Sequence, residues 1–184
     1  LYVFSRLSSA LWQTIFNAIA KMLNDFSSYR PAKIEAKVLE QLNELYLPKT
    51  LKRLEEYSKH SCFDLKTMFS IDEKQKVSLI DIAEQSAMFI QPITPKDVVV
   101  SHGDLCFSNI LFDARVESVK CIDPRGITPK GDLTIYGDRR YDLAKLYHSV
   151  IGLYDFIIAG RFNYQSNKKY PALVIQHSFP DYLK

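Results

Sequence analysis

The sequence has few cysteines, no long apolar run and no dense cluster of basic residues. Its three cysteines, Cys62, Cys106 and Cys121, show no CxxC spacing. This argues against a disulfide framework and a zinc site and favours a reducing, cytoplasmic setting. No apolar stretch approaches the about 20 residues that a membrane span requires. The net charge is only +3 and the lysines and arginines are scattered, so neither a membrane span nor a nucleic-acid partner is expected.

The start of the chain lacks an initiator methionine and the ordered regions of a signal peptide. We therefore expect Leu1 to be an internal point of a longer protein. What the 184 residues do have is the composition of a folded globule, with 47% hydrophobic residues. A chain of this size and composition forms one domain, or one domain with a small appendage, around a buried core.

Helical spacing of apolar residues dominates the first half of the chain. The predicted helices, in chain order, span residues 5–26, 32–47, 50–60 and 75–91. Ser5 or one of the serines close to it is the expected cap of the first helix, and Pro48 is expected to end the second. Residues 63–75 are predicted to form a connection that contains a short helix.

Beyond Pro95 the pattern changes to short apolar runs separated by polar turns. The predicted strands span residues 97–101, 109–113 and 119–123. Helical spacing returns over 137–160, and the tail that follows predicts no single type of element. An order of helices, a small group of strands and then helices indicates an α+β fold that is mostly helical.

Polar residues follow the first predicted strand in the stretch HGDLCFSN, residues 102–109. Phosphoryl transfer needs a carboxylate that accepts a hydroxyl proton, and Mg²⁺ held by hard oxygen ligands. Asp104 and Asn109 have the spacing of the acid and the amide in a kinase catalytic loop. Asp123 ends the third predicted strand. A β-hairpin between Asn109 and Asp123 would bring the two side chains together on one metal ion.

Three segments carry a resemblance to a known family: HGDLCFSNILFD at 102–113, CIDPRG at 121–126 and GDRRYDLAKLYHS at 137–149. They resemble the aminoglycoside phosphotransferase and choline kinase family of kinase-like enzymes. The resemblance extends over residues 97–150. The pattern of residues in these segments is also similar to that of kinase-like domains of bacterial surface-polysaccharide pathways, such as capsular polysaccharide biosynthesis.

The resemblance implies a role for each matching residue. Asp104 matches the catalytic acid of the family, and Asn109 and Asp123 match its Mg²⁺ ligands. Asp142 matches a carboxylate that braces the backbone of the catalytic loop. His102 is expected to brace the loop as well, by packing and hydrogen bonding within it rather than by proton transfer.

One segment departs from the family pattern. The metal aspartate is followed by Pro124 and Arg125, where the family usually has an apolar residue. Arg125 is a candidate contact for phosphate or for an acidic substrate.

The resemblance also implies the place of this chain in a larger protein. A glycine-rich strand-turn-strand and a lysine-bearing strand, which cover the nucleotide in that family, do not occur upstream of the loop. We expect the C-terminal lobe of a kinase-like fold, with a helical block at 1–95, catalytic and metal-binding loops at 96–126 and a helical part at 127–184. The N-terminal lobe of the same protein would be its missing partner, and this chain alone is expected to be inactive.

The expected function is transfer of the γ-phosphoryl group of ATP, with Mg²⁺, to a hydroxyl group of a small molecule. A sugar, choline or a surface-polysaccharide precursor is the expected acceptor. The aromatic residues between 136 and 164 leave open a cage for a quaternary ammonium group, although aromatic residues at helical spacing are more often core. The alternative function is a catalytically inactive kinase-like binding or regulatory module, against which the retained acid and metal ligands argue.

Overall fold

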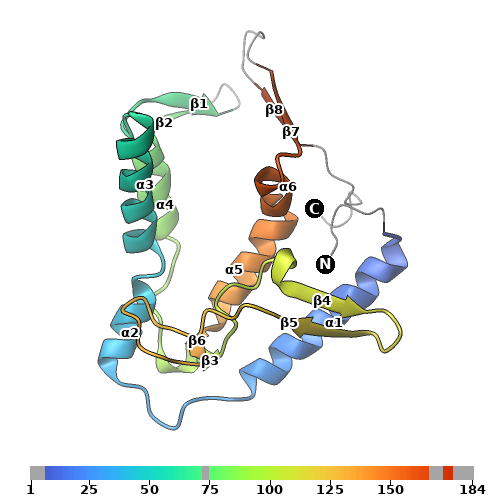
Figure 1. Ribbon diagram of the computed structural model, residues 1–184. Helices are drawn as coiled ribbons and strands as arrows, with labels where there is room; N and C mark the ends of the chain where they lie inside the picture. The colour runs from blue at the N-terminus through green and yellow to red at the C-terminus, as the bar shows by residue number, and fades with distance from the viewer. Residues whose placement is uncertain (1–6, 72–74, 166–171, 176–184) are drawn as a thin grey trace. The chain divides into compact units, whose positions relative to one another are not determined.

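The computed structural model describes residues 7–71, 75–165 and 172–175, and it has an α+β fold, as predicted (Figure 1). The helices are α1 (Ser9–Ser27), α2 (Ala36–Asn43), α3 (Leu47–Ser61), α4 (Leu79–Ala87), α5 (Arg139–Val150) and α6 (Tyr154–Ile158). The strands are β1 (Phe69–Ile71), β2 (Gln75–Val77), β3 (Val98–Val100), β4 (Ile110–Asp113), β5 (Ser118–Cys121), β6 (Tyr136–Asp138), β7 (Phe162–Gln165) and β8 (Ala172–Ile175). Within the described residues they form antiparallel pairs: β1–β2, β3–β6, β4–β5 and β7–β8.

Contacts divide the chain into two compact units. The first comprises the residues up to Pro31, Asp97–Gly126 and the residues from Thr134 onward, and the second comprises Ala32–Lys96 and Ile127–Leu133. Helix α1 belongs to the first unit and α2, α3 and α4 belong to the second, so the predicted helical block is shared between them. Every residue predicted for the functional site belongs to the first unit.

Helix α1 begins at a serine cap, as predicted. The Ser8 side chain accepts a hydrogen bond from the Leu11 amide at 3.3 Å, which satisfies one of the free N–H groups of the first turn. Ser5, the other serine considered, lies outside the described residues. The buried positions of α1 are Trp12, Ile15 and Ile19, whose spacing places them on one face of the helix.

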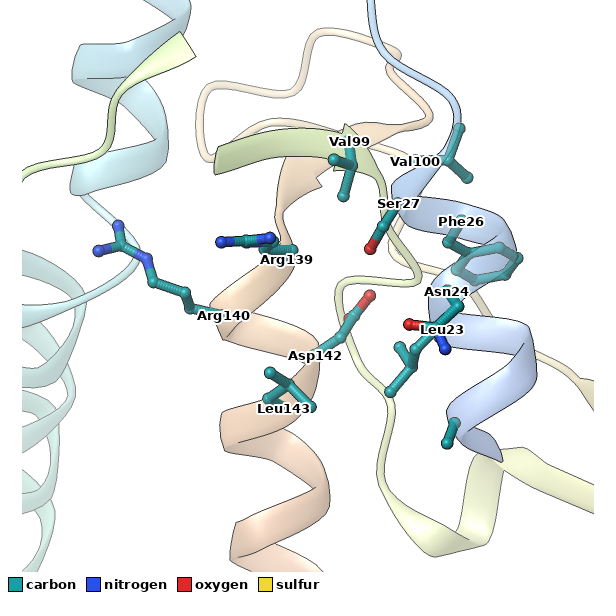
Figure 2. A pocket seen from close by; sticks show the side chains of 11 residues that line it. Leu23, Asn24, Phe26, Ser27, Val99, Val100, Arg139, Arg140, Asp142 and Leu143 are labelled. Atoms are coloured by element: carbon teal, nitrogen blue, oxygen red, sulfur yellow. The ribbon is translucent and has the colours of Figure 1, made fainter. Parts of the chain in front are cut away.

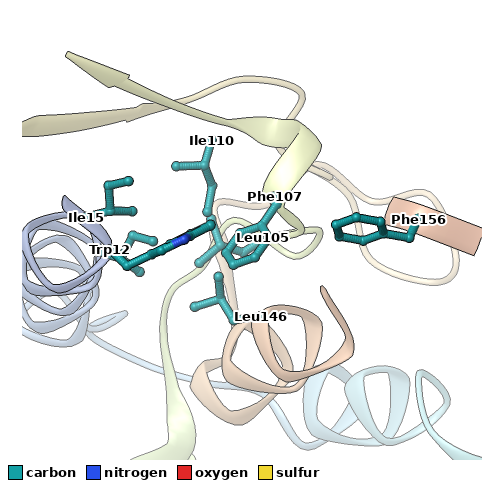
Figure 3. Close-up of a cluster of buried hydrophobic side chains, with 8 residues drawn as sticks. Trp12, Ile15, Leu105, Phe107, Ile110, Leu146 and Phe156 are labelled. Carbon is teal, nitrogen blue, oxygen red and sulfur yellow. The ribbon is translucent and has the colours of Figure 1, made fainter. Parts of the chain in front are cut away.

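The core of the first unit forms around the stretch that follows β3 (Figure 3). It consists of Trp12, Ile15, Ile19, Leu105, Phe107, Ile110, Leu146 and Phe156. Leu105 and Phe107 are fully buried, and the rings of Trp12 and Phe107 lie 5.7 Å apart between centroids. Apolar residues therefore anchor residues 102–109 in the core, which fixes the polar residues that alternate with them.

The three predicted strands are confirmed as β3, β4 and β5. In the β4–β5 hairpin, Ile110 pairs with Cys121 and Asp113 pairs with Ser118. Strand β6 was not predicted. It pairs with β3, with Val98 opposite Asp138, and so places the end of β3 beside the start of α5.

The predicted continuous helix over 137–160 is wrong, because the chain forms β6, α5 and α6 there. Asp138 caps α5 by accepting a hydrogen bond from the Arg140 amide at 2.9 Å. The break between α5 and α6 lies at Gly152 and Leu153, where Leu153 has a left-handed φ of 51°. A Cβ atom on Gly152 would lie 2.6 Å from the carbonyl oxygen of His148, so the turn requires glycine.

The second unit departs most from prediction. Helix α2 ends before Pro48, which lies in the first turn of α3 because proline is tolerated where its missing N–H is not needed. The predicted helix over 75–91 is reduced to α4, since Ser78 starts a capping box with Asp81. The residues on either side of 72–74 form β1 and β2 rather than the predicted connection with a short helix.

Candidate active site

A buried carboxylate of α5 holds the beginning of the loop that follows β3. Asp142 is 1% exposed. Its Oδ2 accepts hydrogen bonds from the Ser101 hydroxyl at 3.0 Å and the His102 amide at 2.8 Å, and its Oδ1 accepts one from the Gly103 amide at 2.7 Å. Burial raises the pKa of Asp142, and the three donors oppose that rise. The contacts are those of a brace for the loop backbone.

His102 also holds the loop and is shielded from solvent. It is 4% exposed, and its Nε2 lies 2.8 Å from the carbonyl oxygen of Ile122. Its Nδ1 accepts a hydrogen bond from the Asp104 amide at 3.3 Å. This pair of contacts assigns the ring proton to Nε2 and ties the loop to the end of the β4–β5 hairpin.

Two further side chains hold the second half of the loop, and neither was predicted from the sequence. The Ser149 hydroxyl accepts a hydrogen bond from the Phe107 amide at 3.1 Å. Asp155 Oδ1 accepts one from the Ser108 amide at 3.2 Å. A helical spacing of seven from Asp142 to Ser149 was the one signal in the sequence, since residues two turns apart share a face.

Gly103 and Arg125 pack closely together at the brace. Gly103 has a φ of +75°, and a Cβ atom there would lie 2.8 Å from the Cβ of Arg125, so only glycine fits. The Arg125 amide donates to the His102 carbonyl at 2.8 Å. Its guanidinium lies 4.7 Å from the ring centre of Tyr141 and donates to the Tyr141 hydroxyl at 3.2 Å. Its Nη1 is buried and has no partner among the described residues.

Asp104, the predicted catalytic acid, lies on this braced loop with its carboxylate partly open to solvent. Its side chain is 41% exposed, and its Oδ1 lies 2.8 Å from the Nζ of Lys145. The Asn109 side chain donates from Nδ2 to the Asp104 carbonyl at 2.9 Å. Lys145 was not predicted from the sequence. Burial alone would lower the pKa of Lys145, but the hydrogen bond and the charge of Asp104 raise it above the ordinary value.

The hairpin brings the start of the Asp123 segment beside Asn109. The Ile122 amide donates to the Asn109 carbonyl at 3.0 Å, and the exposed Asp123 follows in a left-handed conformation with φ 53°. One amide oxygen and one carboxylate suit Mg²⁺, which prefers oxygen ligands and retains several waters. No group of three or more His, Cys, Asp or Glu residues that could hold a metal is present in the described parts of the chain. Asn109 and Asp123 alone could therefore offer such an ion only part of its oxygen ligands.

A cavity of about 360 Å³ adjoins the brace, not the predicted catalytic acid (Figure 2). It is lined by Ala20, Leu23, Asn24, Phe26, Ser27, Val99, Val100, Arg139, Arg140, Asp142 and Leu143. Asp142 projects from α5 into its wall. Asp104, Asn109 and Asp123 are not among the lining residues.

The cysteines near the site lack the features of an activated nucleophile. Cys106 is buried, with its Sγ 3.1 Å from the Ser108 hydroxyl. Burial, followed by the charge of Asp142, raises the pKa of Cys121 to about 11, which keeps that thiol protonated at neutral pH.

Comparisons with protein-family models, with curated proteins and with solved structures found no match to this chain. None of the helices in the described part of the chain combines the length and the apolarity that crossing a bilayer would require.

Proposed function

We propose that this chain is the catalytic lobe of a kinase-like phosphotransferase that moves the γ-phosphoryl group of ATP to a hydroxyl of a small molecule in the cytoplasm. The observation that carries the proposal is the braced loop: Asp142 accepts hydrogen bonds from its first amides, and the Asn109 side chain donates to the carbonyl of Asp104 on the same loop. Phosphoryl transfer depends on positioning and preorganised charge more than on covalent chemistry. A loop held by buried side chains supplies that positioning.

In this proposal Asp104 accepts the proton of the acceptor hydroxyl. Its carboxylate is the acidic group of the loop that combines partial exposure with a fixed backbone. Asn109 uses its Nδ2 to hold Asp104, which leaves its Oδ1 for a metal ion together with Asp123. A bound Mg²⁺ would neutralise the charge of the nucleotide phosphates.

Arg125 adds a cationic donor to the site. A buried donor without a partner is unfavourable by about 1–3 kcal/mol, and more when it is charged. The partnerless Nη1 of Arg125 therefore favours an anionic oxygen, from phosphate or from an acidic acceptor, as a ligand of this side chain.

One aromatic side chain near Asp104 bears on the acceptor. The Nζ of Lys145 lies 5.4 Å from the ring centre of Tyr154, so a cation of the protein already contacts this ring. A quaternary ammonium group would compete with Lys145 for it. This contact argues against the Tyr154 ring as part of a choline cage, and a sugar or a surface-polysaccharide precursor is the acceptor that we propose from the family resemblance.

One observation supports the alternative of a catalytically inactive kinase-like binding or regulatory module. Lys145 occupies one oxygen of the Asp104 carboxylate, and a carboxylate neutralised by a lysine is a weaker base. The alternative would explain the ion pair as a purely structural contact.

The test is an acceptor screen with the natural full-length protein, ATP and Mg²⁺, read by ³¹P NMR for new phosphate esters. Sugars, aminoglycosides and choline form the panel. We expect an ester with at least one sugar-type alcohol, and its loss in D104N. D113N, which changes an exposed aspartate at the hairpin tip, is the matched control and should keep the activity. Ester formation that is equal in D104N and D113N would rule out the proposed chemistry, and nucleotide binding without transfer to any alcohol would support the inactive module.

A further inference from the structure

One face of α5 is directed at the loop, and it carries more than the brace. Asp142 holds the first loop amides and Ser149 holds the Phe107 amide. Lys145 lies between them, three residues after Asp142, and reaches the Asp104 carboxylate. Residues at spacings of three, four and seven share a helix face. One rigid helix thus fixes the loop backbone at two points and the side chain of its acid at a third.

The Lys145–Asp104 pair differs from an ordinary surface ion pair. Its side chains are 21% and 41% exposed, whereas those of the Lys21–Asp25 pair on α1 are 78% and 60% exposed. Exposed pairs are screened by water and hold their geometry weakly. Contact of Lys145 with the Tyr154 ring restricts the ammonium group further.

The ion pair with Lys145 involves only one of the two carboxylate oxygens of Asp104. Lys145 approaches Oδ1 of Asp104 at 2.8 Å, and no described residue forms a hydrogen bond or ion pair with Oδ2. A carboxylate held through one oxygen cannot rotate freely about its last bond. The second oxygen then has a defined direction in which to accept a proton.

We propose that Lys145 is a positioning residue that holds the Asp104 carboxylate through Oδ1 and so presents Oδ2 to the acceptor hydroxyl. This role rests on the proposed phosphotransfer. It also accounts for a lysine beside a general base: the ion pair lowers the basicity of the Asp104 carboxylate but fixes its orientation. Orientation is the larger effect, because a displacement of about 1 Å at a reacting group lowers a rate by about 10²-fold.

Kinetics of the full-length protein test the role. K145M should lower kcat by about 10- to 100-fold with little change in the KM for ATP, because the substitution disturbs orientation rather than nucleotide binding. K145R keeps the charge and should restore a large part of kcat. K21M, which breaks the exposed ion pair of α1, is the matched control and should leave both constants unchanged. Melting curves of the variants detect any loss of fold.

A second readout does not depend on activity. Burial lowers the pKa of Lys145, whereas Asp104, with smaller contributions from Tyr141 and Cys106, raises it, so D104N should lower the pKa of the Lys145 ammonium group relative to the wild type. NMR titration of the lysine side-chain signals measures it, with D25N and the Lys21 signal as the control pair.

The outcomes separate the two claims. An unchanged pKa of Lys145 in D104N overturns the inference, because the ion pair would then not exist in solution. Full kcat in K145M, with transfer lost in D104N, overturns the inference and leaves the proposed function intact. Full transfer in D104N overturns both. A lowered pKa together with a reduced kcat in K145M that K145R restores supports the positioning role.

Discussion

Replacing Asp142 by alanine should loosen the loop and destabilise the protein. The substitution removes the acceptor of the His102 and Gly103 amides and of the Ser101 hydroxyl. The hydroxyl is half-buried and can turn to another partner, so the two amides determine the cost. At about 1–3 kcal/mol for each buried donor left unpaired, the loss is about 2–6 kcal/mol.

Burial of the charged carboxylate is itself unfavourable, as the raised pKa of Asp142 indicates. Removing the carboxylate therefore offsets part of the loss. The net loss should therefore lie in the lower part of that range, at about 2–4 kcal/mol. For a chain of 184 residues, one kcal/mol shifts the melting temperature by about 2–4 °C. We expect D142A to melt about 4–16 °C below the wild type.

Thermal unfolding followed by circular dichroism measures the shift, and hydrogen exchange locates it. The His102 and Gly103 amides should exchange much faster in D142A. The control is D113A, which removes an exposed aspartate that accepts from the Arg115 amide and should change stability by about 0.5 kcal/mol at most. If D142A and D113A have the same melting temperature and the His102 amide exchanges at the wild-type rate, the carboxylate does not brace the loop.

Three further predictions concern the surroundings of the site. G103A should destabilise by more than G160A, because both glycines have positive φ but only the new Cβ of G103A meets another atom, 2.8 Å away on Arg125; equal melting temperatures would contradict the close packing. The pKa of His148 is lowered by burial and by Lys145, against the opposing charges of Asp155 and Asp104. His148 therefore binds a proton at a higher pH in the unfolded chain than in the folded one. The free energy of unfolding should fall as the pH decreases below about 6.5. H148N should flatten that dependence in urea unfolding at several pH values, and an identical slope would contradict the shift. The exposed Cys62 should react with a thiol reagent at pH 8 before the buried Cys106 and before Cys121, whose pKa is raised; a fast phase that persists in C62S would contradict the lower reactivity of these two thiols.

The sequence predicted the strands and the residues of the loop because each carries a local signal. Short β-branched or apolar runs between polar turns mark β3, β4 and β5. The chemistry of phosphoryl transfer restricts the polar groups to an acid and an amide at a known spacing. The hairpin that turns Asp123 toward Asn109 followed from the length of the segment between them.

The remaining features depend on partners distant in sequence. Lys145, Ser149 and Asp155 contact loop residues about 40 positions earlier. Apart from the spacing of seven between Asp142 and Ser149, nothing local distinguishes them from other polar residues of α5 and α6. Strand β6 forms only because β3 lies beside it. In the second unit, apolar residues at helical spacing predicted a helix that begins before Ser78. Ser78 and Asp81 have the spacing of a capping box, which would have predicted the observed start of α4.

The central claim is that Asp104 performs chemistry while Asp123 holds the metal with the nucleotide. The most direct measurement compares D104N and D123N of the full-length protein by calorimetric titration with Mg²⁺–ATP and by the rate of transfer to an accepted alcohol. The account predicts that D104N binds Mg²⁺–ATP nearly as the wild type does and loses about 10²–10⁴-fold in turnover, whereas D123N loses affinity for Mg²⁺–ATP. Near wild-type turnover in D104N, or unchanged Mg²⁺–ATP affinity in D123N, would contradict it.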